Sequence, residues 1–416
     1  MSRGRARSLR AFVALAALAL ATPASFVASG CGSTYRPAAD GDDGSAPEAA
    51  PSTDAPASDG TGGGDGATCA AVVATDPHNC GRCGHDCLGG TCSGGMCNAV
   101  EMAAVGSSLG HVVLAGTTLF ASSSPATVTA SGGIWRIATS GGSAEAFVTG
   151  LDVESMAVLD GTLYFAVYDL PADGASAHGG LYACALTAPA PCNPKLVAAS
   201  TNGAAVATDA AHVFYTDSAP GRGLMVYTPP DAPQVYTTND VGFGNAADIY
   251  VDGPLAFASA NTGTNPTQRA NLFEVPPDGG TLLASYASPT AFTGRLVGSK
   301  DALYFTAYDA RGSTYGGLVH RILRGSGIGC DFAQGRVVRP FGVHADDAHV
   351  FWVNQGVGNE MPYTSSQIAA CPATGCCSTA QILWTGDGQA SDLTGDDRAL
   401  YFVGVVNGSI WKLAKP

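Results

Sequence analysis

The chain has 416 residues, of which 46% are hydrophobic and only 13% charged, with 55 glycines and 24 prolines. This composition is too hydrophobic for a disordered chain and too rich in Gly and Pro for a helical bundle. It predicts an all-β fold with many turns. The net charge of −14 becomes −18 without the four arginines of the first ten residues, which argues against nucleic acid as a partner.

Residues 1–30 have the pattern of a secretory signal peptide. The four arginines precede an apolar run at 11–21 that is too short to span a bilayer. The sequence Val-Ala-Ser-Gly-Cys that ends at Cys31 resembles the lipobox of bacterial lipoproteins. The resemblance implies acylation of the Cys31 thiol and a lipid anchor in the cell envelope, at the periplasmic or outer-membrane surface of a Gram-negative-type bacterium. An ordinary cleavage site nearby is the alternative, with Cys31 as an odd thiol.

The cysteine count favours lipidation. The chain has 13 cysteines, and twelve remain to form pairs if Cys31 carries lipid. No later run of 18 apolar residues occurs, so we expect lipid to be the membrane attachment. Residues 31–67 are mostly Ala, Pro, Gly, Ser, Thr and Asp, a composition that predicts a disordered, acidic tether.

A cysteine-rich module follows at residues 68–98. Its six cysteines, separated by glycines, leave no room for a hydrophobic core, so we expect three disulfides among Cys69, Cys80, Cys83, Cys87, Cys92 and Cys97. A zinc site is the alternative, because Cys80 and Cys83 form a C-x-x-C near His78 and His85. Six cysteines allow 15 pairings, so the sequence leaves the connectivity open. The segment resembles the Asn-Cys-Gly-x-Cys-Gly modules of bacterial surface lipoproteins.

From residue 99 onward the chain repeats one unit seven times. Each unit contains a strand with an apolar or aromatic pair, 42 to 50 residues after the previous one: Leu119-Phe120, Tyr164-Phe165, Phe214-Tyr215, Ala256-Phe257, Tyr304-Phe305, Phe351-Trp352 and Tyr401-Phe402. Three further strands accompany most of the strands that contain these pairs. Asp-Gly or Asp-Asp turns stand just before several of the strands with the pairs, and such turns are typical of hairpins. Four strands per unit and seven units predict a seven-bladed β-propeller over residues 99–416.

Two segments resemble known propellers in detail. Phe351-Trp352-Val353-Asn354 and Phe214-Tyr215-Thr216-Asp217 are similar to the Tyr-Trp-Thr-Asp repeats of lipoprotein receptors and related bacterial lipoproteins. The seventh unit ends after its third strand, so we predict that residues 99–105 supply its fourth strand and close the ring. The remaining cysteines are expected to form structural disulfides, with Cys184–Cys192 and Cys371–Cys376 clipping short loops and Cys330 and Cys377 left as a pair.

The sequence contains few signs of catalysis. No G-x-S-x-G, H-E-x-x-H or Walker motif occurs. The repeated aspartates are expected to serve hairpin turns rather than calcium. Three carboxylates, Glu154, Asp248 and Asp392, are expected near the starts of inner strands, where a propeller enzyme would hold a metal or an acid–base group.

These patterns predict a monomeric binding or scaffold protein with no cofactor and no enzymatic activity, whose ligand is a protein, peptide or glycan. The long loops between second and third strands share one face of a propeller, so we expect the ligand there. Candidate contact residues are Tyr168, Asp169, Tyr308, Asp309, Asn354 and Tyr363. The alternative is a metal-dependent propeller enzyme, similar to a lactonase or a lyase, that uses the three carboxylates.

Overall fold

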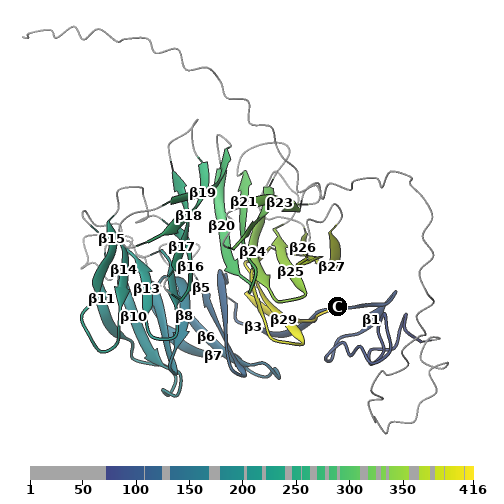
Figure 1. Cartoon of the computed structure of the whole chain (residues 1–416). Coiled ribbons are helices and arrows are strands. Elements are labelled where there is room, and N and C mark those ends of the chain that lie inside the picture. The colour runs from purple at the N-terminus through teal and green to yellow at the C-terminus, as the bar shows by residue number, and fades with distance from the viewer. Residues whose placement is uncertain are drawn as a thin grey trace, which may run out of the picture.

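The computed structural model describes residues 72–106, 108–123, 132–167, 179–200, 204–217, 222–238, 246–253, 255–262, 269–276, 281–287, 291–309, 317–324, 329–333, 337–355, 365–374, 380–387, 389–406 and 408–416. Signal, tether and lipidation at Cys31 fall outside these ranges. Within them the fold is all-β, and no helix could cross a membrane. Seven four-stranded antiparallel sheets surround one axis, which confirms the predicted seven-bladed propeller (Figure 1).

Each blade uses strands that are consecutive in the chain, except the last. Blade 1 contains β4 (His111–Ala115), β5 (Thr118–Ser123), β6 (Gly133–Ala138) and β7 (Glu145–Thr149); blade 2 contains β8 (Val153–Leu159), β9 (Thr162–Val167), β10 (Gly180–Ala185) and β11 (Lys195–Ala199); blade 3 contains β12 (Val206–Thr208), β13 (Val213–Thr216), β14 (Gly223–Tyr227) and β15 (Gln234–Thr238). Blade 4 contains β16 (Ala246–Asp252), β17 (Leu255–Thr262), β18 (Arg269–Val275) and β19 (Thr281–Ala287); blade 5 contains β20 (Ala291–Gly298), β21 (Ala302–Asp309), β22 (Gly317–Leu323) and β23 (Gly329–Ala333). Blade 6 contains β24 (Pro340–Ala345), β25 (His349–Asn354), β26 (Ser366–Pro372) and β27 (Gln381–Gly386); blade 7 contains β28 (Ala390–Gly395), β29 (Ala399–Gly404), β30 (Ser409–Ala414) and β3 (Val100–Ala104).

The ring closes as the sequence predicts. Strand β3 pairs antiparallel with β30, with Val100 opposite Lys412 and Ala104 opposite Ser409. The first strand of the propeller domain is therefore the outer strand of its last blade. This pairing satisfies the backbone groups that the third strand of an unfinished blade would leave at an exposed edge.

The repeated aromatic residues form the packing between blades. Phe120, Phe165, Tyr215, Phe305 and Trp352 are each about 1% exposed or less, on the second strands of five different blades. Phe257 and Phe402 occupy the same strand in blades 4 and 7 and are also buried. Phe120 and Phe165 share one buried cluster between blades, as do Phe257 and Phe305, whereas Tyr215, Trp352 and Phe402 each lie in a cluster of their own.

Aspartates close several hairpins between first and second strands. The Oδ1 atom of Asp346 accepts hydrogen bonds from the backbone N–H groups of Ala348 and His349. Asp209 and Asp396 make the same pair of bonds in blades 3 and 7. This geometry confirms hairpin chemistry as the role of these three aspartates.

The cysteine-rich module packs on the propeller. Its short hairpin pairs β1 (Cys92–Ser93) with β2 (Met96–Cys97), and disulfides join Cys80 to Cys92 and Cys87 to Cys97. These four cysteines share one buried cluster with side chains of blades 6 and 7, among them Phe351. The module thus lies against the same part of the propeller where the ring closes (Figure 1).

The disulfide predictions are confirmed wherever the described residues reach. Cys184 and Cys192 are joined across the β10–β11 connection. Cys83, Cys330 and Cys371 are also disulfide-bonded. Cys69, Cys376 and Cys377 lie outside the described residues, so the pairing among the last four cysteines of the propeller stays a prediction.

Candidate functional site

The innermost strands of the seven blades surround a central channel. It holds a cavity of about 350 Å³, whose wall is mostly Val, Ala and Leu from β4, β8, β12, β16, β20, β24 and β28. One end of the channel opens where the inner strands begin, on the side of the long connections between second and third strands. We call this the long-loop end, and the opposite side, with its tight Asp turns, the hairpin end.

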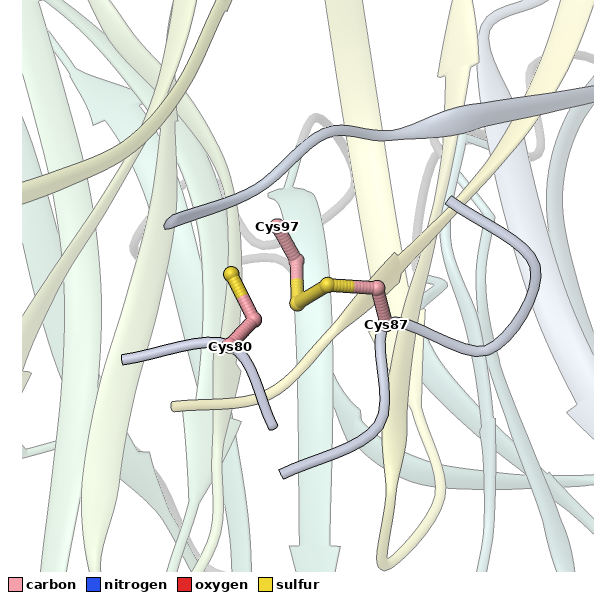
Figure 2. Close-up of side chains that lie close together, drawn as sticks. All are labelled: Cys80, Cys87 and Cys97. Atoms are coloured by element: carbon pink, nitrogen blue, oxygen red, sulfur yellow. A yellow bond between two sulfur atoms is a disulfide. The ribbon is translucent and has the colours of Figure 1, made fainter. Parts of the chain in front are cut away.

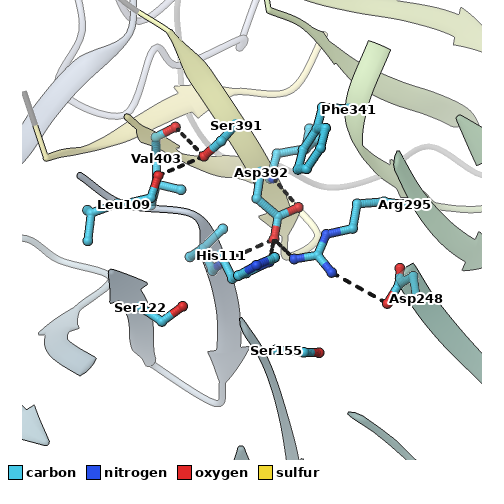
Figure 3. Close-up of polar contacts among 12 residues, drawn as sticks. Leu109, His111, Ser122, Ser155, Asp248, Arg295, Phe341, Ser391, Asp392 and Val403 are labelled. Atoms are coloured by element: carbon cyan, nitrogen blue, oxygen red, sulfur yellow. Dashed lines mark hydrogen bonds and ion pairs between the residues drawn. The ribbon is translucent and has the colours of Figure 1, made fainter. Parts of the chain in front are cut away.

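An arginine bridges two carboxylates near the long-loop end. Arg295 lies 3.5 Å (Nη1) from Oδ1 of Asp248 and 3.2 Å (Nη2) from Oδ2 of Asp392 (Figure 3). These residues come from blades 5, 4 and 7, and all three are at least nine-tenths buried. The bridge therefore joins three blades across the channel rather than two neighbours in one sheet.

A bulge in the inner strand of blade 5 places Arg295 in the channel. The pairing of β20 with β21 shifts between Thr293 and Leu296, so two residues oppose one partner. Gly294 allows this, because a Cβ there would lie 2.8 Å from the backbone oxygen of Phe341 in the next blade. The arginine's own N–H donates to Oγ1 of Thr306 at 2.8 Å, which fixes the bulge.

Each bridged carboxylate also binds the backbone of the next blade. Oδ2 of Asp248 accepts a hydrogen bond from Leu296 N at 2.8 Å, and Oδ2 of Asp392 accepts one from Val112 N at 3.2 Å. Oγ of Ser155 accepts from Val206 N in the same way, at 3.1 Å. A serine suffices for this bond in blade 2, so the two carboxylates add to it the ion pairs with Arg295.

The two histidines of the channel lie at opposite ends. His111 Nδ1 is 3.7 Å from Oδ2 of Asp392, and this buried nitrogen has no hydrogen-bond partner among the described residues. His344 lies towards the hairpin end, 3.4 Å from the Lys415 ammonium. Burial and this neighbouring charge lower the pKa of His344 to about 4, so it is neutral at physiological pH.

Burial dominates the electrostatics of Asp248. It raises the pKa of this carboxyl to about 8, the Leu296 N–H opposes the shift, and the negative charge of Asp392 adds to it. Asp248 is therefore largely protonated at neutral pH, and its contact with Arg295 is then a hydrogen bond rather than a full ion pair.

The three channel carboxylates singled out in the sequence do not act together. Asp248 and Asp392 meet through Arg295, whereas Glu154 sits at the bulge of β8 and does not line the cavity. Nothing in the sequence singled out Arg295, the residue that connects Asp248 and Asp392. Its position depends on a two-residue bulge, and the strand pattern alone does not reveal such a shift.

The candidate ligand contacts differ from expectation where they are described. Tyr308 is 8% exposed beneath the Arg339 guanidinium, and burial raises its pKa. Asn354 is 1% exposed, and its Oδ1 accepts hydrogen bonds from Trp352 Nε1 and Val338 N. Both side chains are engaged inside the protein. Tyr168, Asp169, Tyr363 and the side chain of Asp309 lie outside the description.

Figure 2 shows the sulfur cluster of the module. The sulfur atoms of Cys80, Cys87 and Cys97 lie within 4.8 Å of one another, a spacing that a metal ion could bridge. All three belong to the disulfides Cys80–Cys92 and Cys87–Cys97, however, and zinc binds thiolates rather than disulfide sulfurs. The cluster therefore supports the disulfide interpretation of the module.

No protein-family model matches this chain, and no curated protein matches it in sequence. Solved propellers resemble it in structure. Selenomethionine-substituted virginiamycin B lyase from Staphylococcus aureus has a TM-score of 0.53 at 12% identity, over 77% of this chain and 99% of that one. A catalytically inactive variant of that lyase with quinupristin has a TM-score of 0.51 at 11% identity, over 77% and 99%. BamB from Moraxella catarrhalis has a TM-score of 0.40 at 9% identity, over 76% and 96%. At these identities the likeness shows the fold alone.

Proposed function

We propose that this chain is a lipid-anchored, extracytoplasmic binding or scaffold protein whose propeller presents its long-loop face to a ligand. The sequence supports the location through its signal-like start and Cys31. The charged groups of the channel hold neighbouring blades together. This structural use argues against a catalytic role for them and so favours the binding role. Asp248 and Asp392 each accept a backbone N–H from the next blade and share Arg295.

The competing function is a metal-dependent enzyme that uses the channel carboxylates. A divalent metal there would have to displace a guanidinium that both carboxylates already contact. It would also take carboxylate lone pairs away from the Leu296 and Val112 N–H groups. The third expected ligand, Glu154, does not line the cavity. This arrangement favours a structural role for the two carboxylates, which hold neighbouring blades together. Ligand recognition would then take place on the face around the channel.

Elemental analysis separates the two functions. We expect the natively purified chain to contain no stoichiometric divalent metal, and Asp392→Asn to leave any ligand binding intact. A stoichiometric ion that is lost in Asp392→Asn would support the enzyme instead.

Capture experiments test the binding role itself. The purified chain, immobilised and exposed to cell-envelope extract, should retain a defined component that a disulfide-reduced, unfolded sample does not. Membrane fractionation tests the anchor, because Cys31→Ser should release the protein into the soluble fraction. Retention of Cys31→Ser on membranes would contradict lipidation as the anchor.

A further inference from the structure

A pocket of about 380 Å³ lies between blades 4 and 5, near the hairpin end. Its lining is mostly apolar and comes from both blades, with Phe257 and Leu283 from blade 4 and Leu303 and Ile322 from blade 5. Leu255, at the start of β17, also lines the pocket and is 39% exposed. Part of this apolar lining therefore faces solvent.

Three charged residues complete the lining, and they are not all paired. Arg324 forms an ion pair with Asp252 and donates a hydrogen bond to the Tyr250 hydroxyl at 2.9 Å. Glu274, half-buried on β18, has no hydrogen bond or ion pair among the described residues. The pocket thus has an unpaired carboxylate beside an apolar wall, which favours an occupant that is both apolar and cationic.

Blade 1 shows what can fill this position. Arg136 is the counterpart of Glu274, because each pairs with the aromatic residue of the second strand in its blade. By the same register, Phe147 on β7 is the counterpart of Leu283 on β19. Phe147 is fully buried, and the Arg136 guanidinium carbon lies 4.9 Å from its ring centroid. An aromatic ring and a guanidinium thus occupy in blade 1 the place where blade 4 has a smaller aliphatic side chain and a carboxylate.

The tether predicted at residues 31–67 carries the same two groups. Tyr35 is its only aromatic residue and Arg36 its only basic residue, and the two are adjacent. Residues 37–71 separate Arg36 from Val72, where the described module begins. A stretch of that length extends to roughly 115 Å, several times the radius of gyration of about 20 Å for a domain of this size. The pair can therefore reach blades 4 and 5 from the module.

We propose that Tyr35 and Arg36 dock in this pocket, with the Tyr35 ring against Leu303 and Ile322 and the Arg36 guanidinium paired with the Glu274 carboxylate. The contact would complete the interface between blades 4 and 5 with the groups that blade 1 supplies from its own strands.

Two other cavities of the described residues suit this pair less well. The cavity beside the Cys184–Cys192 disulfide is lined by Lys195, whose charge repels a guanidinium. The central channel already holds Arg295. Charge therefore selects the pocket between blades 4 and 5.

Docking would also set the orientation of the propeller at a membrane. Cys31 precedes Tyr35 by only a few residues, so an acyl group on Cys31 would lie beside the hairpin end of blades 4 and 5. The long-loop face would then point away from the bilayer. This orientation rests on the proposed function, whereas the docking itself needs no lipid.

Photo-crosslinking of the full chain tests the docking. With p-benzoylphenylalanine in place of Tyr35, irradiation should join this residue, within one chain, to peptides that contain Leu303 or Ile322. The same photo-residue in place of Ala57, further along the tether, is the control. It should label these peptides about tenfold less, because it meets the pocket only at random.

Two sets of variants identify the groups that hold the segment. Arg36→Glu and Glu274→Arg should each lower the crosslinking yield about fivefold, and the two together should restore it. Leu283→Phe fills the pocket as Phe147 does in blade 1, so it should abolish the crosslink without lowering the melting temperature. Leu282→Phe is the matched control, because this neighbouring side chain is 52% exposed and does not line the pocket.

Three results would overturn the proposal: crosslinks spread over the propeller surface, crosslinks confined to dimers, or an unchanged yield in both Leu283→Phe and Glu274→Arg. Each of them leaves membrane attachment and ligand capture untouched, so the docking can fail while the proposed function stands. Loss of attachment or of capture with the crosslink retained would contradict the proposed function and support the docking.

Discussion

The Nε2 atom of His85 lies 2.7 Å from the backbone carbonyl oxygen of Lys415, 330 residues further along the chain. Its other ring nitrogen lies 2.5 Å from the carbonyl oxygen of Cys80. The imidazole ring therefore lies between a carbonyl of the module and a carbonyl that follows β30. One side chain thus connects the cysteine-rich module to the last residues of blade 7.

Replacing this histidine should loosen the module. In His85→Ala the imidazole contact between the module and Lys415 is lost, and we expect the melting temperature to fall by roughly 3 °C and the module to become more sensitive to protease. Differential scanning calorimetry and limited proteolysis measure the two effects. His78→Ala is the control, because the side chain of His78 is 76% exposed and bonds only within the module. Equal behaviour of both variants would show that the contact does not hold the module.

Removing Arg295 should be far more costly than removing a surface arginine. Arg295→Met leaves Asp392 buried without its counter-charge, and breaking a buried pair in this way costs about 3–5 kcal/mol. Denaturant unfolding should show this loss, while the exposed Arg398→Met changes stability little. Adding Asp392→Asn to Arg295→Met should restore part of the stability, since the uncompensated charge is then gone. A double variant no more stable than Arg295→Met would contradict the charge explanation.

Stability should fall as the pH rises from about 6.5 to 8. The native state keeps the Asp248 proton up to a pKa of about 8, whereas the unfolded chain releases it near 3.8, so the native state binds more protons throughout that range. The lowered pKa of His344 has the opposite effect, but only between about 4 and its ordinary 6.5. Asp248→Asn should flatten the dependence above pH 6.5. Thermal melts across this window measure it, and a parallel slope in the variant would assign the effect to other groups.

The closure strand should be sensitive to proline. Ala103 pairs with Ile410, and a proline there removes a backbone donor and distorts the outer strand of blade 7. We expect the melting temperature of Ala103→Pro to fall by roughly 5 °C. Ala99→Pro, just before the strand, should have a smaller effect. If both prolines are tolerated equally, closure by β3 contributes little to stability.

Much of the fold could be predicted because one physical requirement repeats. Every blade must bury an aromatic or apolar second strand against its neighbour, so residues such as Phe165 and Phe305 recur at intervals of 42 to 50 residues. The closure was predictable for a related reason. The seventh unit has no outer strand of its own, and an unpartnered strand stands before the first unit.

The site was much harder to predict, because it depends on bulges in the inner strands, which occur in blades 2, 4, 5, 6 and 7. Arg295 enters the channel through a bulge, which shifts the side-chain alternation that the sequence pattern assumes. Asn354 was expected to face a ligand because it begins a long connection between second and third strands, yet its Oδ1 accepts a hydrogen bond from the Trp352 indole.

The pairing of β3 with β30 also sets an order of events during synthesis. Ala104 emerges early from a ribosome or a translocation channel, but its partner Ser409 follows about three hundred residues later. Blades 1 to 6 can assemble from neighbouring hairpins while the chain is still growing, whereas the ring stays open until its end arrives. Throughout that interval the earliest strand of the domain is an unpaired edge beside a cysteine-rich segment that is forming its own bonds. This short strand therefore waits longer for its partner than any other strand of the propeller.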